Sequence, residues 1–403
     1  MILTKSISSR IDYCAPNNPN LEELLSAENQ EIFAPIVTDF LNLLSTEILE
    51  DRRSREFPDV LAFALWCRSL KRGEYQSEKF GRFGRGLVFH VTPGNVPINF
   101  AYSLVSGLLS GNKNIVRLPS KKYDQIEFFL KKVNLFLDQE IYSQVRERMI
   151  LLRYPRDKSI NDFFSGICDV RVIWGGNQTI DEIRASKIPA KSTEITFADR
   201  FSFCSINSAE YLKSSEKIRI AHAFYNDTYL FDQNACTAPH LIAWVGERET
   251  SEKASQIFWE DIETITTNRY SIEAVQIIDK LVAAARFSAS NPGAKLVRNS
   301  DNKIFRIKVN SISYRIEDFK SHSGLFYELN VSSLIELDKI INSNFQTMTY
   351  FGFTSAELDL FIQESSKRGI DRIVPMGKSL DFSLFWDGHD LISALSRKIT
   401  FCE

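Results

Sequence analysis

One cysteine of this chain lies in a setting that suits nucleophilic chemistry. Cys236 stands between Asn234-Ala235 and Thr237-Ala238, small or polar neighbours that leave room for a ligand. A helix or strand terminus at this point would offer backbone N–H groups, which lower the pKa of a thiol and stabilise an oxyanion. The alternative is the ordinary role of a lone cysteine, a small buried apolar side chain. The local sequence leaves both interpretations open.

The other cysteines and the histidines show no spacing typical of disulfides or metal ligands. The six cysteines stand singly, no C-x-x-C pair occurs, and the five histidines have no ligand spacing. We therefore expect no disulfide framework and no metal site. His240 is close enough to Cys236 in the chain to serve as an acid or base, although its apolar surroundings favour a packing role.

Charge and composition exclude several classes of protein. The 403 residues include 49 Lys and Arg against 51 Asp and Glu, a net charge of -2, which argues against binding nucleic acid through bulk electrostatics. The N-terminus lacks the regions of a signal peptide, and no apolar stretch reaches the length of a membrane span. These features predict a cytoplasmic protein with reduced thiols and no membrane span.

The elements that must position these residues follow an alternating pattern. Short apolar runs alternate with helical patterns, which predicts a doubly wound parallel sheet with ligands at the carboxyl ends of its strands. The expected strands cover residues 86–91, 114–118, 148–153 and 169–174. The alternation of apolar runs and helical patterns changes near residue 201. We therefore expect a first domain at 1–205, with 369–403 packing back on it, and an α/β domain carrying Cys236 at 206–368.

Several short motifs occur in an order that resembles the aldehyde dehydrogenase superfamily. The turn Gln233-Asn234-Ala235-Cys236 resembles its nucleophile turn, and Thr92–Pro97 resembles its Pro-Trp-Asn-Phe-Pro loop. The other matching segments are Asn114–Ser120, Ile173–Asn177, Thr193–Ile195 and Tyr327–Val331. Within that superfamily, His90–Pro97, the Gln-Asn-Ala-Cys-Thr-Ala-Pro turn and Trp386-Asp387-Gly388 resemble the acyl-CoA reductase family. The resemblance covers roughly residues 80–400 and implies an aldehyde dehydrogenase-like α/β fold.

The resemblance implies an oxidoreductase that reduces a fatty acyl thioester, acyl-CoA, to an aldehyde with NADPH through an acyl-cysteine at Cys236. The Cys236 N–H and the Asn95 amide would stabilise the oxyanion. Glu194 matches the position of a catalytic glutamate in hydrolytic relatives. It either takes part in the site or is an ordinary capped or solvated carboxylate. His240 completes the catalytic candidates.

The resemblance also implies a dinucleotide site. Pro93-Gly94 and Gly175-Gly176 would allow close backbone approach, and a basic cluster with a hydroxyl would accept a 2′-phosphate, which favours NADPH without excluding NADH. The residues expected to contact the cofactor are Thr92, Pro93, Gly94, Arg117, Ser120, Lys121, Gly175, Gly176 and Glu328.

Two alternatives for the function stay open. The acyl group could come from an acyl-protein synthetase, an acyl carrier protein or an acyl phosphate instead of coenzyme A. The chain could also be a non-reductive acyl carrier or transferase on the same fold.

The resemblance further implies a homo-oligomer, because members of the superfamily commonly form dimers or tetramers.

Overall fold

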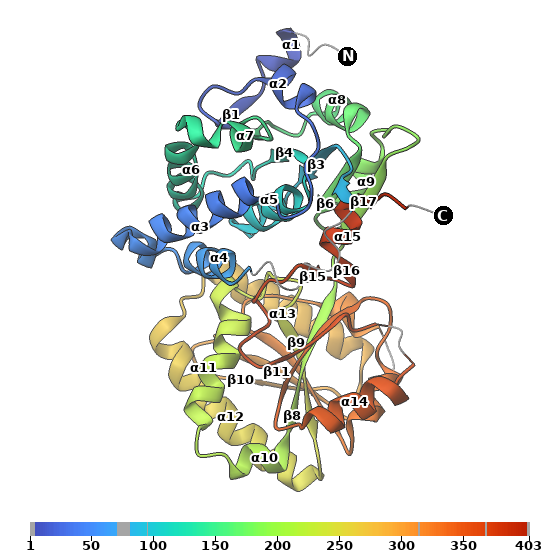
Figure 1. Cartoon of the computed structure of the whole chain (residues 1–403). Coiled ribbons are helices and arrows are strands. Elements are labelled where there is room, and N and C mark those ends of the chain that lie inside the picture. Colours follow the sequence, from blue (N-terminus) through green and yellow to red (C-terminus); the bar gives the residue numbers. More distant parts are fainter. Residues whose placement is uncertain (1–4, 71–80, 95, 313–314, 367–368, 401–403) are drawn as a thin grey trace. The chain divides into compact units, whose positions relative to one another are not determined.

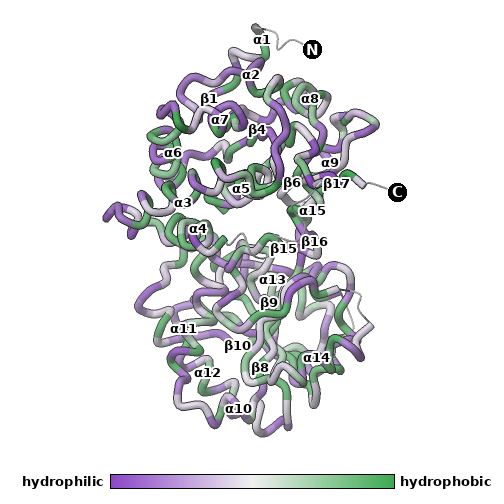
Figure 2. The backbone as a smooth tube through the Cα atoms, in the orientation of Figure 1, coloured by the Kyte–Doolittle hydropathy of each residue, from purple (hydrophilic) through white to green (hydrophobic). Residues whose placement is uncertain are grey.

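The computed structural model describes residues 5–70, 81–94, 96–312, 315–366 and 369–400. The chain forms two compact units, residues 1–198 with 382–403, and residues 199–381 (Figure 1). The expected boundaries at 205/206 and 368/369 differ from these by 7 and 13 residues (205 against 198, and 368 against 381). The reason is that the strand beginning at Phe201 and the strand ending at Pro375 pair with strands of the second unit. In each unit the strands and the inward sides of the helices carry the apolar residues (Figure 2).

The first unit is built on a six-stranded sheet of order β1-β5-β4-β3-β6-β7, in which only β1 is antiparallel. Its strands are β1 (Asp12–Ala15), β3 (Leu87–Val91), β4 (Lys113–Arg117), β5 (Met149–Arg153), β6 (Val170–Trp174) and β7 (Thr193–Phe197). All five residues of β3, β5 and β6 are buried. Continuous apolar strands of this kind occur where helices cover both faces of a parallel sheet.

Helices cover both faces of this sheet. One face packs against α3, α4, α5 and α6, and the other against α2, α8 and α9. The helices of the unit are α1 (Lys5–Ser8), α2 (Leu21–Ser26), α3 (Pro35–Glu50), α4 (Pro58–Ser69), α5 (Asn99–Leu109), α6 (Asp124–Leu137), α7 (Ser143–Arg146), α8 (Lys158–Ile167), α9 (Asn177–Arg184) and α15 (Leu391–Leu395). The chain winds one way from β3 and the other way from β6, so the order of strands reverses between these two neighbours. This is the switch point at which such sheets bind ligands.

A buried polar chain holds the two strands of the switch point to α5. The Trp174 indole N–H donates to the Ser103 hydroxyl oxygen over 2.9 Å, and Ser103 lies 2.7 Å from Nδ1 of His90. Nε2 of His90 lies 3.0 Å from Oδ1 of Asn114. Burial lowers the pKa of His90 to about 4, so the ring is neutral at pH 7. Its Nε2–H therefore donates to Asn114, and Nδ1 accepts from Ser103.

The C-terminal segment belongs to the first unit. Phe382, Trp386, Leu391 and Leu395 pack against apolar residues of β3, β6 and β7. The segment also forms a hairpin of β15 (Phe385–Trp386) and β16 (His389–Asp390), and its last strand, β17 (Ser396–Lys398), pairs with β2 (Arg82–Gly84).

The second unit contains a seven-stranded sheet of order β10-β11-β12-β9-β8-β13-β14, in which only β10 is antiparallel. Its strands are β8 (Phe201–Asn207), β9 (Pro239–Val245), β10 (Lys295–Arg298), β11 (Phe305–Val309), β12 (Leu325–Val331), β13 (Phe345–Phe351) and β14 (Arg372–Pro375). All seven residues of β9 are buried, and this central strand follows directly on the Cys236 turn.

Two separate cores fill the faces of this second sheet. One core packs against α10, α11 and α12, and the other against α13 and α14. The helices are α10 (Ser208–Lys213), α11 (Lys217–Thr228), α12 (Arg248–Arg269), α13 (Ala274–Ser290) and α14 (Ser355–Glu364). Among the residues that the structure describes, none of the helices combines the length and apolar composition needed to cross a membrane.

Candidate active site

Cys236 lies in a tight turn at the amino end of β9. The turn is closed by a backbone hydrogen bond from the Ala238 N–H to the Ala235 carbonyl over 3.0 Å. The Cys236 carbonyl accepts a hydrogen bond of 2.7 Å from the hydroxyl of Ser202 on β8, the neighbouring strand. Cys236 is half-buried, and this anchored backbone places its thiol at the amino edge of the second sheet.

Burial disfavours ionisation of the other cysteines that the structure describes. None of the five cysteines that the structure describes takes part in a disulfide. Burial raises the pKa of the Cys14 thiol to about 11 and that of Cys168 to about 12, and it raises the pKa values of Cys67 and Cys204 as well. A thiol with a raised pKa is a poor nucleophile at neutral pH because the thiolate is the reactive form. Cys402 lies outside the described residues.

Two histidines lie beside the Cys236 turn. His240 on β9 is completely buried against the ring of Phe201, and burial lowers its pKa well below the ordinary value. Its imidazole is therefore neutral at pH 7. His322, which the sequence analysis left unassigned, has its ring 6.1 Å from that of His240, and its Nδ1 donates to the Gln233 carbonyl over 3.0 Å. In the sequence, His322 lies in the polar run Ser-His-Ser-Gly before β12, and this run was the only local pattern that could have marked it as a candidate.

In the first unit, the predicted cofactor loops lie at one edge of the sheet. Residues 92–94 follow β3 and residues 175–176 follow β6, so both loops leave the carboxyl ends of the strands at the switch point. Nothing lies within 4 Å of the point where a side chain would begin at Gly94 or Gly176. The Thr92 hydroxyl donates to the Arg117 carbonyl over 2.6 Å, which ties this loop to the end of β4. Asn95 lies outside the described residues.

The basic residues predicted to select the cofactor are placed at the same edge. The Arg117 guanidinium lies 4.6 Å from the centre of the Tyr154 ring, and the Lys121 ammonium lies 5.0 Å from that of Tyr123. The Tyr123 hydroxyl in turn donates to the Gly94 carbonyl over 2.7 Å. Ser120 and Lys121 are exposed. The structure therefore brings the two loops and the basic cluster together at the carboxyl edge of the first sheet.

Glu194 lies at the opposite edge of that sheet. It is the second residue of β7, opposite Arg171 at the amino end of β6, whereas the cofactor loops leave the carboxyl ends. Arg171 donates to Oε2 of Glu194 from both Nε and Nη2, and Arg184 donates to Oε1 over 2.7 Å. These ion pairs give the carboxylate a structural role, so we leave Glu194 out of the proposed site.

Glu328 is also placed differently from the expectation. We expected Glu328 to contact the ribose of the cofactor. In the structure it is the fourth residue of β12, and its side chain is only 3% exposed. Its Oε2 accepts from the indole N–H groups of Trp244 and Trp259, both over 2.9 Å, and from the Ser255 hydroxyl over 2.7 Å. Arg306 lies 3.5 Å from its Oε1. Glu328 thus joins α12 to the sheet within the core of the second unit.

Asp227, in the last turn of α11, makes stability depend on pH. Asp227 accepts from the Gly377 N–H over 2.6 Å and the Ser379 N–H over 2.9 Å, and burial raises its pKa to about 6. Because the folded state keeps this proton at a higher pH than the unfolded state does, stability should fall as pH rises from about 4 to 6, by roughly 2–3 kcal/mol from this group.

We expect Asp227→Asn to remove this part of the pH dependence. The free energy of unfolding in urea, measured at several pH values for both proteins, should then show a flatter slope between pH 4 and 6 in the variant. Equal slopes for the two proteins would contradict the assignment to Asp227.

Comparison with solved structures defines the class of the fold. Aldehyde dehydrogenase 21 from Physcomitrella patens, solved with the reaction product succinate, is similar over 93% of this chain and 86% of its own, with a TM-score of 0.64 and 11% identity. Betaine aldehyde dehydrogenase from Staphylococcus aureus, solved with NAD+, is similar over 90% of this chain and 82% of its own, with a TM-score of 0.62 and 12% identity. The expected aldehyde dehydrogenase-like α/β fold is confirmed.

Sequence comparison then gives the family. The profile of the family described as acyl-CoA reductase (LuxC) matches residues 66–400, so the chain belongs to that family. Proteins named long-chain acyl-protein thioester reductase are similar to it: that of Vibrio harveyi is 22% identical over 336 residues, and that of Photorhabdus laumondii 22% over 333 residues. Each match covers 79% of this chain but only 64% of the relative, less than two thirds of its length.

Proposed function

We propose that this protein reduces a long-chain acyl thioester to the aldehyde through an acyl-cysteine at Cys236. The observation that carries the proposal is the Cys236 turn, which holds a half-buried thiol at the amino edge of a sheet. The other described cysteines have thiols whose pKa values are raised by burial. Membership of the acyl-CoA reductase family and the names of the relatives support the same chemistry.

The first half-reaction uses groups of the chain alone. The Cys236 thiolate attacks the acyl carbon of the thioester and forms a C–S bond. The charge that develops on the carbonyl oxygen is stabilised by the Cys236 N–H and, by the family resemblance, by the Asn95 side-chain amide. The tetrahedral adduct then expels the thiolate of the donor, which takes a proton, and leaves the acyl group on Cys236.

The carboxyl edge of the first sheet fits a nicotinamide dinucleotide. The open space at Gly94 and Gly176 lies at the switch point. The helix α9 begins directly after Gly176 without a side-chain cap, so its first N–H groups can donate hydrogen bonds to a phosphate. Arg117, Ser120 and Lys121 would hold a 2′-phosphate, which favours NADPH. When bound, the cofactor supplies the hydride that reduces the acyl group to the aldehyde level.

The residues of the chain also determine how the acyl-cysteine is released. Collapse of the reduced adduct breaks the C–S bond, frees the aldehyde and restores the Cys236 thiol. A carboxylate that activated water would divert the acyl-cysteine to a free acid. Glu194 is held by two arginines, so it is not available for that role, and a reductase benefits from its absence.

The purified chain incubated with a long-chain acyl-CoA and NADPH should form the aldehyde, and NADH should serve less well. Lys121→Gln should raise the KM for NADPH about tenfold and leave the KM for NADH unchanged, because it removes one charge near the 2′-phosphate. Lys131→Gln, an exposed lysine on α6, is the matched control.

Each outcome of this experiment assigns the donor or rejects the reaction. Aldehyde from an acyl-protein but not from acyl-CoA would assign a protein donor, in line with the names of the relatives. Acylation of Cys236 without any reduction by either nicotinamide would indicate an acyl transferase and reject the reductase.

A further inference from the structure

Asp232 and Gln233, immediately before the Cys236 turn, have an unusual backbone. Both residues are left-handed, with φ values of +54° and +55°. Residues other than glycine rarely adopt this conformation, and two in succession persist only where the surrounding contacts over-determine them. The contacts that hold these two residues therefore determine the course of the chain into the turn.

The side chain of Asp232 is held by three donors from separate segments. The Tyr270 hydroxyl donates to Oδ1, while the Gln276 side chain and the Ser323 hydroxyl donate to Oδ2 over 2.7 Å and 3.0 Å. Tyr270 follows α12, Gln276 lies in the first turn of α13, and Ser323 precedes β12. Asp232 is thus fixed from outside the turn.

Gln233 is completely buried, and both ends of its amide bond to the backbone. Its Nε2 donates to the Pro239 carbonyl over 3.1 Å and to the Leu325 carbonyl over 3.3 Å. Its Oε1 accepts from the N–H groups of Gly324 over 2.7 Å and Leu325 over 3.2 Å. The bond to Pro239 closes the loop that contains Cys236, and the bonds to residues 324 and 325 anchor that loop to the start of β12.

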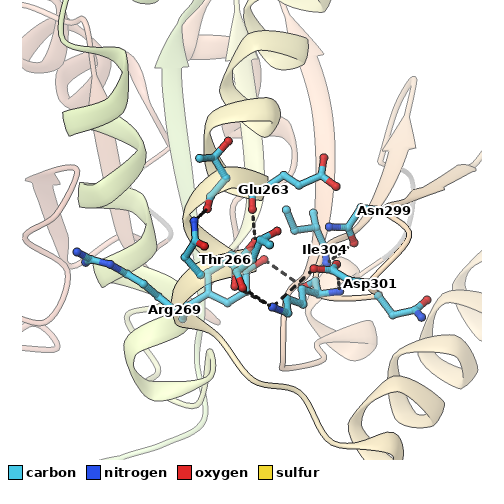
Figure 3. Close-up of polar contacts among 12 residues, drawn as sticks. Glu263, Thr266, Arg269, Asn299, Asp301 and Ile304 are labelled. Atoms are coloured by element: carbon cyan, nitrogen blue, oxygen red, sulfur yellow. Dashed lines mark hydrogen bonds and ion pairs between the residues drawn. The ribbon is translucent and has the colours of Figure 1, made fainter.

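The backbone that receives Gln233 is itself fixed. Gly324 has a φ of +86°, and a side chain there would begin 2.2 Å from the Lys303 carbonyl oxygen, so only glycine presents its N–H to Gln233 at this point. The Lys303 ammonium donates to the Thr266 and Thr267 carbonyls over 3.1 Å and 3.0 Å. Figure 3 shows polar contacts in this region, where the end of α12 at Thr266 lies beside the loop that carries Asn299, Asp301 and Ile304.

From this geometry we propose that Gln233 is a positioning residue: its side-chain amide sets the place of the Cys236 thiol for attack on the acyl carbon. The inference rests on the proposed function for its catalytic consequence. The structural part, that Gln233 orders residues 234–238, stands on the hydrogen bonds alone.

Gln233→Met tests the proposal, because methionine keeps the shape of the side chain and removes all four hydrogen bonds. We expect acylation of Cys236 by a long-chain acyl-CoA to slow about 100-fold, since a small displacement of a reacting atom has an effect of this order. Alkylation of Cys236 by iodoacetamide, which needs only an accessible thiolate, should change less than about tenfold. Mass spectrometry of the Cys236 peptide measures both rates.

The matched control is Asn330→Leu. The Asn330 side-chain amide donates to the Trp244 and Gly246 carbonyls over 3.0 Å and 3.1 Å, so it joins the same two strands at the far end of the sheet. It should lower the unfolding temperature without slowing acylation. Acylation that slows equally in both variants, or alkylation that slows as much as acylation in Gln233→Met, would overturn the proposal.

Two further measurements separate the possible failures. If Gln233→Met does not fold, Gln233→Glu is the second variant. Its carboxyl group, kept protonated by burial, retains an acceptor for Gly324 and Leu325 and one donor in place of two, so it should show a smaller loss of acylation. If the natural protein is not acylated at all, the proposed function fails. Positioning is then judged by hydrogen exchange of the amides at 234–238, which should accelerate in Gln233→Met and not in Asn330→Leu.

Discussion

Cys236→Ala should abolish the covalent acyl adduct and reduce aldehyde formation by about 10⁴-fold or more, because no other group replaces the atom that forms the new bond. The variant should fold normally, since Cys236 is half-buried and the turn is held by its backbone and by Ser202. Intact mass after incubation with acyl-CoA reports the adduct, and the aldehyde produced with NADPH reports turnover.

The matched control for this variant is Cys14→Ala. Cys14 is also half-buried, but the pKa of its thiol is raised to about 11, so it is protonated at neutral pH. Its replacement should leave both readouts unchanged. Full aldehyde formation by Cys236→Ala, or an adduct mapped to another cysteine, would contradict the proposed nucleophile.

Glu328→Leu should destabilise the second unit by about 3–5 kcal/mol, the usual cost of removing one member of a buried charged network. The change leaves the indole N–H groups of Trp244 and Trp259 without their acceptor and the Arg306 guanidinium without its partner. Unfolding in urea, followed by tryptophan fluorescence, measures the loss, and two of the reporting tryptophans contact the altered position.

Two further variants separate this structural role from a role in cofactor binding. Glu328→Gln keeps an oxygen acceptor and should cost only about 1–2 kcal/mol. Glu252→Gln breaks an exposed ion pair with Arg248 and should cost less than about 1 kcal/mol. A Glu328→Gln protein of unchanged stability but with a strongly raised KM for NADPH would contradict the structural role and restore the expected ribose contact.

The alternation of strands and helices in the first unit could be predicted from the sequence because it depends on local patterns. The apolar runs expected at 86–91, 114–118, 148–153 and 169–174 become β3, β4, β5 and β6, each shifted by no more than one residue at its ends. Parallel strands buried on both faces are continuous in apolar residues, so the pattern marks them without tertiary information. The carboxyl-edge position of the loops at Gly94 and Gly176 followed from the same alternation.

The two carboxylates show what the order of motifs leaves open. Glu194 and Glu328 each stand at the expected place in that order, and the sequence left the role of Glu194 undecided, because order along the chain does not reveal which side chains will surround a residue. The strand pairing places Arg171 beside Glu194, and the docking of α12 on the second sheet places Trp259 and Ser255 against Glu328. A buried carboxylate is stabilised by such donors, so its role depends on partners that only the fold brings near.

The sequence by itself was enough to identify the family and the fold class and to propose Cys236 as the nucleophile, because each depends on residue types and their order. Only the tertiary structure decided what orients that cysteine. Gln233 lies three residues before Cys236 and belongs to the same short motif. The role we propose for it depends on its hydrogen bonds to Pro239, Gly324 and Leu325. Those bonds exist because β9 and β12 are neighbours in the sheet, and the pairing of strands far apart in the chain is a property of the whole fold.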